Sequence, residues 1–188
     1  AEVRVKKGAQ VDEGEVLVNG ERVSFGSPRE ALDHGIATIA QELALVPALS
    51  VAENVFLGRE PRRVGFIGRK RLSAQYRTLS ERTGFDLPAD TPVGALRTAD
   101  QQKVEIMRAL ARGASVIIMD EPTAALSGAD ADLLHAVVRQ FAASGHTVVL
   151  ISHFLSEVLE LADDITVLRD GRLIRTGPAA DETEASLI

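Results

Sequence analysis

Two consecutive carboxylates follow a short apolar run and could support metal-dependent phosphate chemistry. Val116 to Met119 is predicted to be a buried parallel strand, and Asp120 and Glu121 come directly after it. Sheets of α/β proteins bind ligands at the carboxyl ends of their strands. One acid there can hold Mg²⁺, and the second can orient or deprotonate a water that attacks a phosphate. The alternative is that both acids cap the next helix, with Pro122 at an early helical position.

A histidine follows a second apolar run, Thr147 to Ile151, which is also predicted to be a buried strand. His153 could bond a phosphate oxygen and the attacking water; the alternative is a structural histidine at a strand end. The remaining histidines are expected on helix surfaces or in loops: His34, His135 and His146.

A glutamine follows a third short apolar run, Ile36 to Ile39. Gln41 could bond Mg²⁺ or a water, and the alternative is a solvated loop residue. Because the carboxyl ends of these strands should share one edge of the sheet, Gln41 and His153 are predicted to converge with the two acids on one cleft.

The elements around these residues alternate between strands and helices. A hairpin is predicted from Glu15 to Phe25 around Asn19-Gly20, and a short helix from Ser27 to about His34. Between residues 47 and 112 the pattern is helical, with a capping box at Ser50 and no convincing strand. The helices expected there run from Arg69 to Thr83 and from Gln101 to Ala111.

The last third predicts strand–helix–strand crossovers, which indicate an α/β fold with a parallel sheet. An amphipathic helix is expected over Asp130 to Ala143, a shorter one over Ser156 to Leu161, and a closing hairpin around Asp170-Gly171. The residues of the first helix that should point inward are Leu133, Leu134, Val137, Val138 and Phe141.

Composition excludes several functional classes. The 188 residues contain no cysteine, so no disulfide scaffold, thiolate zinc site or cysteine nucleophile is possible. The net charge of −6 and the 4% aromatic content argue against a general nucleic-acid binder. No run approaches the ~20 apolar residues of a membrane-spanning helix. We therefore expect a cytoplasmic protein.

The order of these motifs resembles the nucleotide-binding domain of an ABC transporter, from about Asp12 onward. Several segments are most similar to the sugar-importer branch, which includes ribose, galactose and xylose ATPases, and Ala124–Ser127 resembles the first of its two tandem cassettes. The segments that carry the resemblance are Gly35–Leu43, Glu53–Pro61, Gln101–Ile106, Met119–Thr123 and Ile151–His153.

The resemblance implies a P-loop NTPase-like cassette, with a parallel core sheet, an antiparallel hairpin element and an inserted α-helical lobe. The core would comprise residues 1–46 and 113–188, and the lobe residues 47–112. It also implies that ATP and Mg²⁺ are the cofactors. The implied partners are membrane permease subunits, a second cassette and, indirectly, a periplasmic or extracellular sugar-binding protein, with no nucleic acid. The protein would then be peripheral on the inner face of the cell membrane.

The resemblance further assigns roles to single residues. Asp120 would serve Mg²⁺ as the Walker B acid, Glu121 would be the catalytic base, and His153 the switch histidine. Gln41 would sense Mg²⁺ and the attacking water and face the membrane subunit. Residues Ala125, Leu126 and Ser127 would form the D-loop, which crosses the dimer interface.

Two departures from the family pattern concern phosphate binding. No lysine in the sequence follows a glycine, so the Gly-Lys-Ser/Thr loop that cradles phosphates is absent, together with the strand expected before it. The signature segment reads Leu96, Arg97, Thr98, Ala99 and Asp100, with arginine where the family has serine. Arg97 could pair with a phosphate. Its bulk and missing hydroxyl are nevertheless expected to weaken the half of the nucleotide site that this segment would contribute across the dimer.

Three alternatives remain open from the sequence: an ATPase subunit that energises sugar import, a non-catalytic remnant or regulatory module, and a soluble ABC ATPase of DNA repair or translation. Against the last alternative, ABC ATPases of DNA repair carry a long coiled coil within the domain, and this sequence shows none. The lobe near Gln41 to Val55 is expected to dock on the membrane subunits. A basic cluster is either a solvated face or a contact with that partner or with lipid headgroups: Arg59, Arg62, Arg63, Arg69, Lys70 and Arg71.

Overall fold

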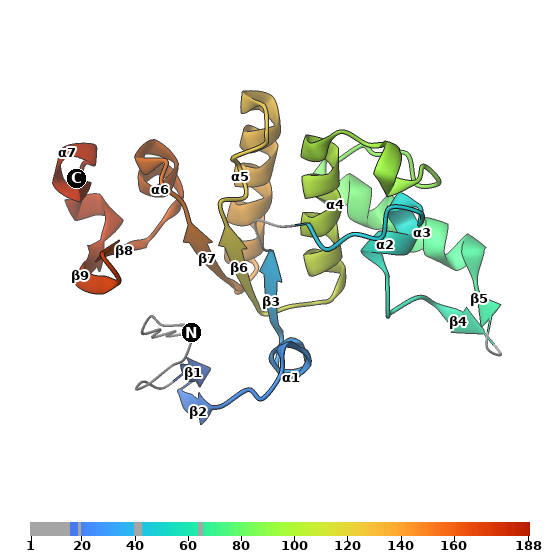
Figure 1. Cartoon of the computed structure of the whole chain (residues 1–188), viewed down its shortest axis with the longest axis horizontal. Helices are drawn as coiled ribbons and strands as arrows, with labels where there is room; N and C mark the ends of the chain where they lie inside the picture. The colour runs from blue at the N-terminus through green and yellow to red at the C-terminus, as the bar shows by residue number, and fades with distance from the viewer. Residues whose placement is uncertain (1–15, 19, 40–42, 64–65) are drawn as a thin grey trace. The chain divides into compact units, whose positions relative to one another are not determined.

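The computed structural model describes residues 16–18, 20–39, 43–63 and 66–188, and Gln41 and Asn19 lie outside this part. The chain divides into two compact units (Figure 1). One unit spans Gly35–Ile151. The other combines Ala1–His34 with Ser152–Ile188.

The unit Gly35–Ile151 is built on a parallel sheet in the strand order β3-β6-β7. The three strands are β3 (Ile36–Ile39), β6 (Val116–Asp120) and β7 (Thr147–Ile151). Ile39 pairs with Met119, and Asp120 pairs with Ile151, so the carboxyl ends of these strands lie at the same edge. The sheet confirms the predicted α/β class with its parallel strands.

β7 is more exposed than a central strand. In the described part of the chain its only strand neighbour is β6, and its last residue, Ile151, is 50% exposed. The prediction of a fully buried strand is therefore wrong for β7, whereas Ile117 and Met119 of β6 are almost completely buried.

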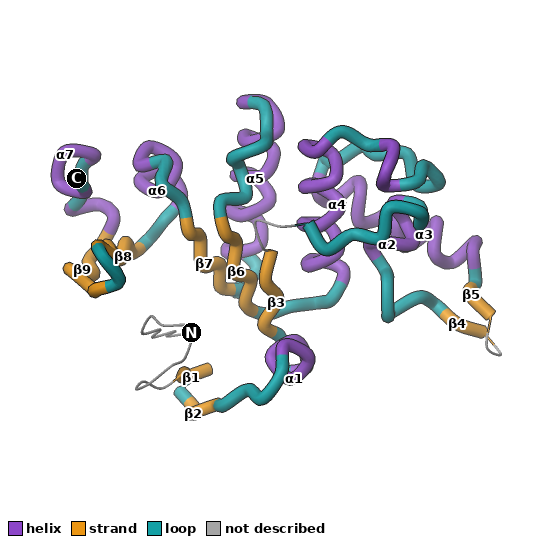
Figure 2. The backbone as a smooth tube through the Cα atoms, in the orientation of Figure 1, coloured by secondary structure: helices purple, strands orange, loops and turns teal. Residues whose placement is uncertain are grey.

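Helices cover the sheet and form a lobe beyond it (Figure 2). α4 packs against β3 and α5 against β7, while α2 and α3 pack on α4. The bounds are α2 (Val51–Val55), α3 (Arg69–Thr83), the 3₁₀ turn η1 (Val93–Ala95), α4 (Thr98–Ala111) and α5 (Gly128–Ala143). The capping box at Ser50 is present, and α3 has the predicted bounds.

Two local expectations in this unit are wrong. The lobe region contains a small antiparallel hairpin, β4 (Arg62–Arg63) and β5 (Phe66–Ile67), whose two-residue strands are too short to show an alternating pattern. On α5, Leu133 is 38% exposed and His135 is buried, although the sequence predicted the reverse. Leu133 and His135 both lie at the margin of the apolar stripe of α5, where the neighbouring elements decide which side chain is buried.

The described residues of the other unit form two antiparallel hairpins and three short helices. Ser27 caps α1 as predicted, and the turn residues Gly20 and Asp170 have positive φ values of 82° and 50°. The elements are β1 (Val16–Val18), β2 (Glu21–Val23), α1 (Pro28–Asp33), α6 (Leu155–Leu161), β8 (Asp164–Arg169), β9 (Arg172–Pro178), the 3₁₀ turn η2 (Ala179–Asp181) and α7 (Glu184–Leu187).

Candidate functional site

The acidic pair lies where β6 ends, as the sequence predicted. Asp120 is the last residue of β6, and Glu121 follows it with φ 47°, in the left-handed region that non-glycine residues rarely adopt. The Glu121 N–H donates to the carbonyl of Ile151 at 2.8 Å, which ties this turn to the end of β7. Strained backbone of this kind persists where the surroundings impose it, and it concentrates at functional sites.

This pair suits Mg²⁺ bound together with a phosphate ligand. Among the described residues, no group of three histidine, aspartate or glutamate side chains is placed to hold a metal ion by itself. Magnesium commonly binds proteins through one or two carboxylates and keeps waters or substrate phosphates as its other ligands. Asp120 at the end of β6 can supply such a carboxylate, and Glu121 follows it directly in the chain.

The segment after the acids forms consecutive turns that lead into α5. The N–H of Ala124 donates to the carbonyl of Glu121 at 3.3 Å, and that of Leu126 to the carbonyl of Thr123 at 2.9 Å. Ser127 then caps α5, and its hydroxyl also donates to Asp130 at 2.8 Å. Residues Ala125, Leu126 and Ser127 are thus held in one local conformation by short-range hydrogen bonds.

The signature-like segment forms the start of α4. Leu96 ends the preceding 3₁₀ turn, Arg97 is the N-cap residue, and the helix begins at Thr98 instead of the predicted Gln101. The Arg97 side chain is 80% exposed and pairs with Asp100 at 3.2 Å. This exposed cation occupies the position at which the family resemblance expects a small serine hydroxyl.

A buried lysine connects the signature-like segment with the start of α5. Lys103 Nζ lies 2.6 Å from Asp130 Oδ1 and 3.3 Å from Asp100 Oδ1. Its side chain is 11% exposed and those of the two acids 19% and 16%, so all three are largely shielded from water. Lys103 therefore joins the first turn of α4 to the first turn of α5, a link that the sequence analysis missed because it depends on packing between distant segments.

We expect Lys103→Met to lower the free energy of unfolding by about 2 kcal/mol, between the values typical of exposed and of buried ion pairs. The substitution keeps the length of the side chain and leaves Asp130 shielded without its cation. Urea denaturation of both proteins measures the difference. Lys70→Met on the exposed surface of α3 is the matched control and should change stability by less than about 0.5 kcal/mol. Equal losses for both variants would contradict the role of the link.

The pH dependence of this difference follows from the two pKa shifts. The hydrogen bond from Lys103, followed by that from Ser127, lowers the pKa of Asp130. Burial alone would lower the pKa of Lys103, but the hydrogen bonds to Asp130 and Asp100 outweigh burial and raise it. Stabilisation is lost below the lowered aspartate pKa and above the raised lysine pKa, so the effect of Lys103→Met should be largest between about pH 5 and 10.

His153 lies in a loop that its neighbours hold in place. The Ser152 hydroxyl donates to Glu157 at 2.8 Å and accepts the N–H of Phe154 at 3.1 Å, and the His153 ring lies 4.2 Å from the ring of Phe154 between centroids. The buried Glu157 was not singled out by the sequence analysis. His153 belongs to the unit Ala1–His34 with Ser152–Ile188, and Gln41 lies outside the described residues, so their convergence with the acids stays a prediction.

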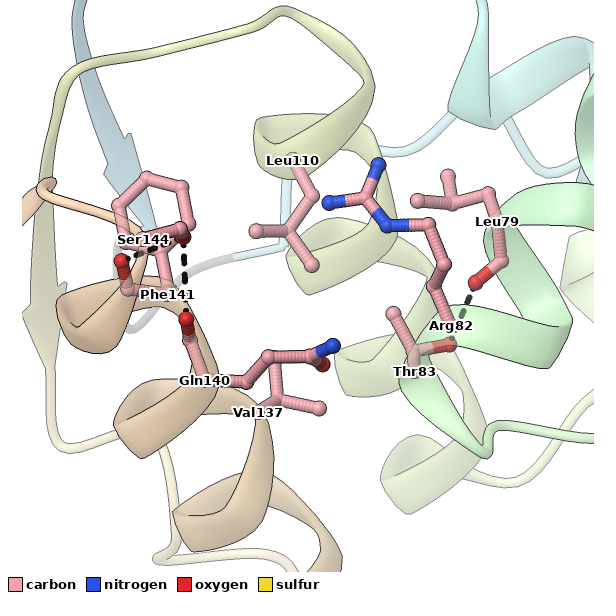
Figure 3. Close-up of a pocket in the computed structure, with 8 residues that line it drawn as sticks. All are labelled: Leu79, Arg82, Thr83, Leu110, Val137, Gln140, Phe141 and Ser144. Carbon is pink, nitrogen blue, oxygen red and sulfur yellow. Dashed lines mark hydrogen bonds between the residues drawn. The ribbon is translucent and has the colours of Figure 1, made fainter.

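The helical part of the unit Gly35–Ile151 carries two adjoining hollows. The first lies between α3, α4 and α5, where the Arg82 side chain extends beside Leu110 (Figure 3). The second, of about 260 Å³, is bordered by Phe56, Gln75, Thr78, Leu79, Arg82, Leu110 and Ala111.

Among the helices that the structure describes, none combines the length and the apolar character that a membrane-spanning segment needs.

Comparisons with known proteins point to one family. A family profile described as ABC transporter matches residues 5–124. The ribose import ATP-binding protein RbsA 3 of Rubrobacter xylanophilus is 46% identical over 93% of this chain and 35% of its own length. The arabinose import ATP-binding protein AraG of Yersinia pestis is 42% identical over 87% of this chain and 31% of its own length. The chain thus spans about a third of these relatives.

Solved structures show the same fold. A dimeric ATP-binding cassette in a post-hydrolysis state with ADP and phosphate superimposes with a TM-score of 0.74, at 25% identity, over 89% of this chain and 74% of that one. A nucleotide-free cassette of an ABC transporter gives 0.71, also at 25% identity, over 94% of this chain and 74% of that one. Both are cassette folds with the α/β architecture described above.

Proposed function

Because this chain belongs to the ABC transporter family, we propose that it is part of a subunit that hydrolyses ATP to energise sugar import across the cytoplasmic membrane. The observation that carries the proposal is the acidic tip of β6, where the strained Glu121 follows Asp120. Names of the relatives at 42–46% identity supply the substrate class, a sugar.

Each polar group at the proposed site has a distinct task. Asp120 would hold Mg²⁺, directly or through water, and bound Mg²⁺ would neutralise charge on the ATP phosphates. Glu121 would accept a proton from the attacking water, because its carboxylate comes directly after Asp120 and so lies next to the proposed Mg²⁺ site. Gln41 would sense Mg²⁺ and this water, and His153 would bond the transferred phosphate.

Further segments are proposed to act at a dimer interface with a second cassette. Residues Leu96, Arg97, Thr98, Ala99 and Asp100 would face the nucleotide of the partner, and Ala125, Leu126 and Ser127 would cross the interface. Lys103 supports this pairing of roles because it links Asp100 of the first segment to Asp130, whose carboxylate accepts a hydrogen bond from the Ser127 hydroxyl. The exposed Arg97 is proposed to weaken this half-site, since it replaces a small hydroxyl with a bulky cation.

The lobe, residues 47–112, is proposed to dock on membrane permease subunits, and residues 1–46 with 113–188 to form the core. The hollow bordered by Phe56, Thr78 and Arg82 supports this surface, because it combines apolar side chains with a cation in the lobe. A periplasmic or extracellular sugar-binding protein would act indirectly. The subunit would then work at the inner face of the membrane.

The test uses the complete gene product assembled with its permease in lipid vesicles. We expect Mg²⁺-dependent ATP hydrolysis that rises when the sugar-loaded binding protein is added. A charge placed in the proposed docking hollow, Thr78→Glu, should reduce this stimulation, whereas Glu81→Gln elsewhere on α3 should not. Assembly without any ATP hydrolysis would contradict the proposal and favour the alternative, a non-catalytic ABC-like remnant or regulatory module, which the arginine at position 97 also favours.

A further inference from the structure

A buried carboxylate lies four positions after His153 in the chain, and no step of the proposed reaction uses it. Glu157 is 7% exposed and belongs to the first turn of α6. Moving a carboxylate out of water costs free energy that hydrogen bonds must offset. The hydrogen-bond partner of this carboxylate therefore indicates what Glu157 does for the surrounding chain.

The Ser152 hydroxyl links this carboxylate to the backbone at the start of α6. The hydroxyl donates to Glu157 Oε2 at 2.8 Å, and its oxygen accepts the N–H of Phe154 at 3.1 Å. Hydrogen bonds to a carboxylate are stronger than those between neutral groups, so Glu157 fixes the direction in which the hydroxyl points. With its only proton directed to Glu157, the oxygen of Ser152 presents its lone pairs to the Phe154 N–H.

These two bonds resemble a capping box in which a hydroxyl is inserted between the usual partners. In an ordinary capping box, the acid at the third helical position accepts the N–H of the N-cap residue directly. Phe154 is the N-cap residue of α6, and Glu157 is the third residue of that helix. Because Ser152 connects the two and lies before His153, the hydrogen bonds fix the chain on both sides of the histidine.

The imidazole of His153 packs against the ring of the residue that follows it. The two ring centroids lie 4.2 Å apart, and the ring planes of His153 and Phe154 are inclined by 35°. Both side chains are exposed, Phe154 by 44%. The imidazole is therefore accessible to a ligand, and its orientation depends in part on where the backbone places the Phe154 ring.

Capping of α6 alone does not require this arrangement. At α2 and α5 the N-cap residues Ser50 and Ser127 cap their helices directly with their own hydroxyls. At α6 the N-cap position holds Phe154, which makes no side-chain cap hydrogen bond, and the hydroxyl lies two positions earlier. The three-residue loop that this hydroxyl closes has His153 at its centre, so the hydrogen bonds order the histidine loop as well as the helix.

We propose that Glu157 and Ser152 are positioning residues for His153, because together they fix the loop that carries its imidazole. The consequence for catalysis rests on the proposed function, in which His153 bonds the transferred phosphate. Groups that act on a transition state must be held in a defined position, and a displacement of about 1 Å can cost about 10²-fold in rate. Glu157 would thus influence the reaction through Ser152 without touching the nucleotide.

Nuclear magnetic resonance of the complete protein, with ¹³C in the histidine rings, tests the positioning without ATP. The resonance that is missing in His153→Asn identifies this imidazole, and its ring-current shift should vanish in Phe154→Leu. Ser152→Ala and Glu157→Leu should remove most of the shift. Ser152→Thr keeps the hydroxyl and Glu157→Gln keeps an acceptor oxygen, so both should restore part of it. Glu160→Leu, the same change at an exposed position of α6, is the matched control and should leave the shift unchanged.

ATP hydrolysis by the assembled transporter tests the consequence for catalysis. Ser152→Ala and Glu157→Leu should lower kcat about tenfold and leave KM for ATP within about twofold, because a misplaced imidazole affects the transition state more than nucleotide binding. Ser152→Thr and Glu157→Gln should recover part of kcat, and Glu160→Leu should retain the wild-type value. A merely structural role would instead lower the amount of folded protein and leave the kinetics of the folded fraction unchanged.

The outcomes separate this proposal from the proposed function. A His153 resonance that does not respond to Ser152→Ala and Glu157→Leu, or that responds equally to Glu160→Leu, would overturn the positioning. A changed resonance with wild-type kcat would overturn its consequence for catalysis. An inactive wild type would remove the proposed function and, with it, the catalytic consequence, whereas the resonance experiment would still decide whether Glu157 and Ser152 position the imidazole.

Discussion

Replacing Glu121 with glutamine in the complete protein should lower kcat for ATP hydrolysis by about 10²- to 10⁴-fold, the usual contribution of a general base. Glutamine keeps the size of the side chain and its hydrogen-bonding capacity, but it cannot take up the proton of the attacking water. The backbone should not change, because the left-handed turn is held by the N–H of Glu121, which donates to Ile151. The loss should therefore be chemical and not structural.

The measurement is a steady-state and single-turnover comparison with the wild type in the presence of Mg²⁺. KM for ATP should change little, since the proton transfer occurs only in the transition state. Glu81→Gln, the same chemical change on the exposed face of α3, is the matched control and should retain wild-type kcat. A kcat for Glu121→Gln within about threefold of the wild type would mean that another group activates the water.

The strands of the parallel sheet and the two acids at the end of β6 could be predicted because their signals are local. Val116–Met119 is a continuous apolar run, and the polar residues Asp120 and Glu121 after it mark its end. The capping box at Ser50 similarly fixed the start of α2. Such features depend on neighbouring residues, and a sequence pattern contains them directly.

The hydrogen bonds that join the side chains of Glu105 and Arg108 on α4 to the backbone of Ala44 could not be predicted from any local pattern. Glu105 is 61 positions from Ala44 and Arg108 is 64 positions from it, and both read as ordinary charged residues of an amphipathic helix. The start of α4 was missed for another reason. Arg97 occupies the N-cap without a side-chain cap hydrogen bond, so the sequence contains no start signal before Thr98.

The second large effect concerns the 188-residue chain when it is purified by itself. We expect no binding of Mg-ATP by calorimetry at millimolar nucleotide and no measurable hydrolysis. Asp120 and Glu121 repel phosphates unless cations and N–H donors offset their charge. In this sequence no lysine follows a glycine, and the buried Lys103 is engaged by Asp100 and Asp130. The acids at the end of β6 thus lack the phosphate cradle that the chemistry requires.

The size of the effect follows from how phosphoryl transfer is catalysed. Positioning and charge stabilisation supply almost all of the acceleration, and loss of one preorganised donor costs about 10²–10³ in rate. Loss of a whole cradle should cost far more, which places hydrolysis by this chain below detection. The complete gene product, measured in parallel, is the control and should bind Mg-ATP. Phosphate release by the purified chain that disappears in Glu121→Gln would overturn the expectation, because another cation, with the exposed Arg97 of a second copy as the first candidate, would then have to replace the cradle.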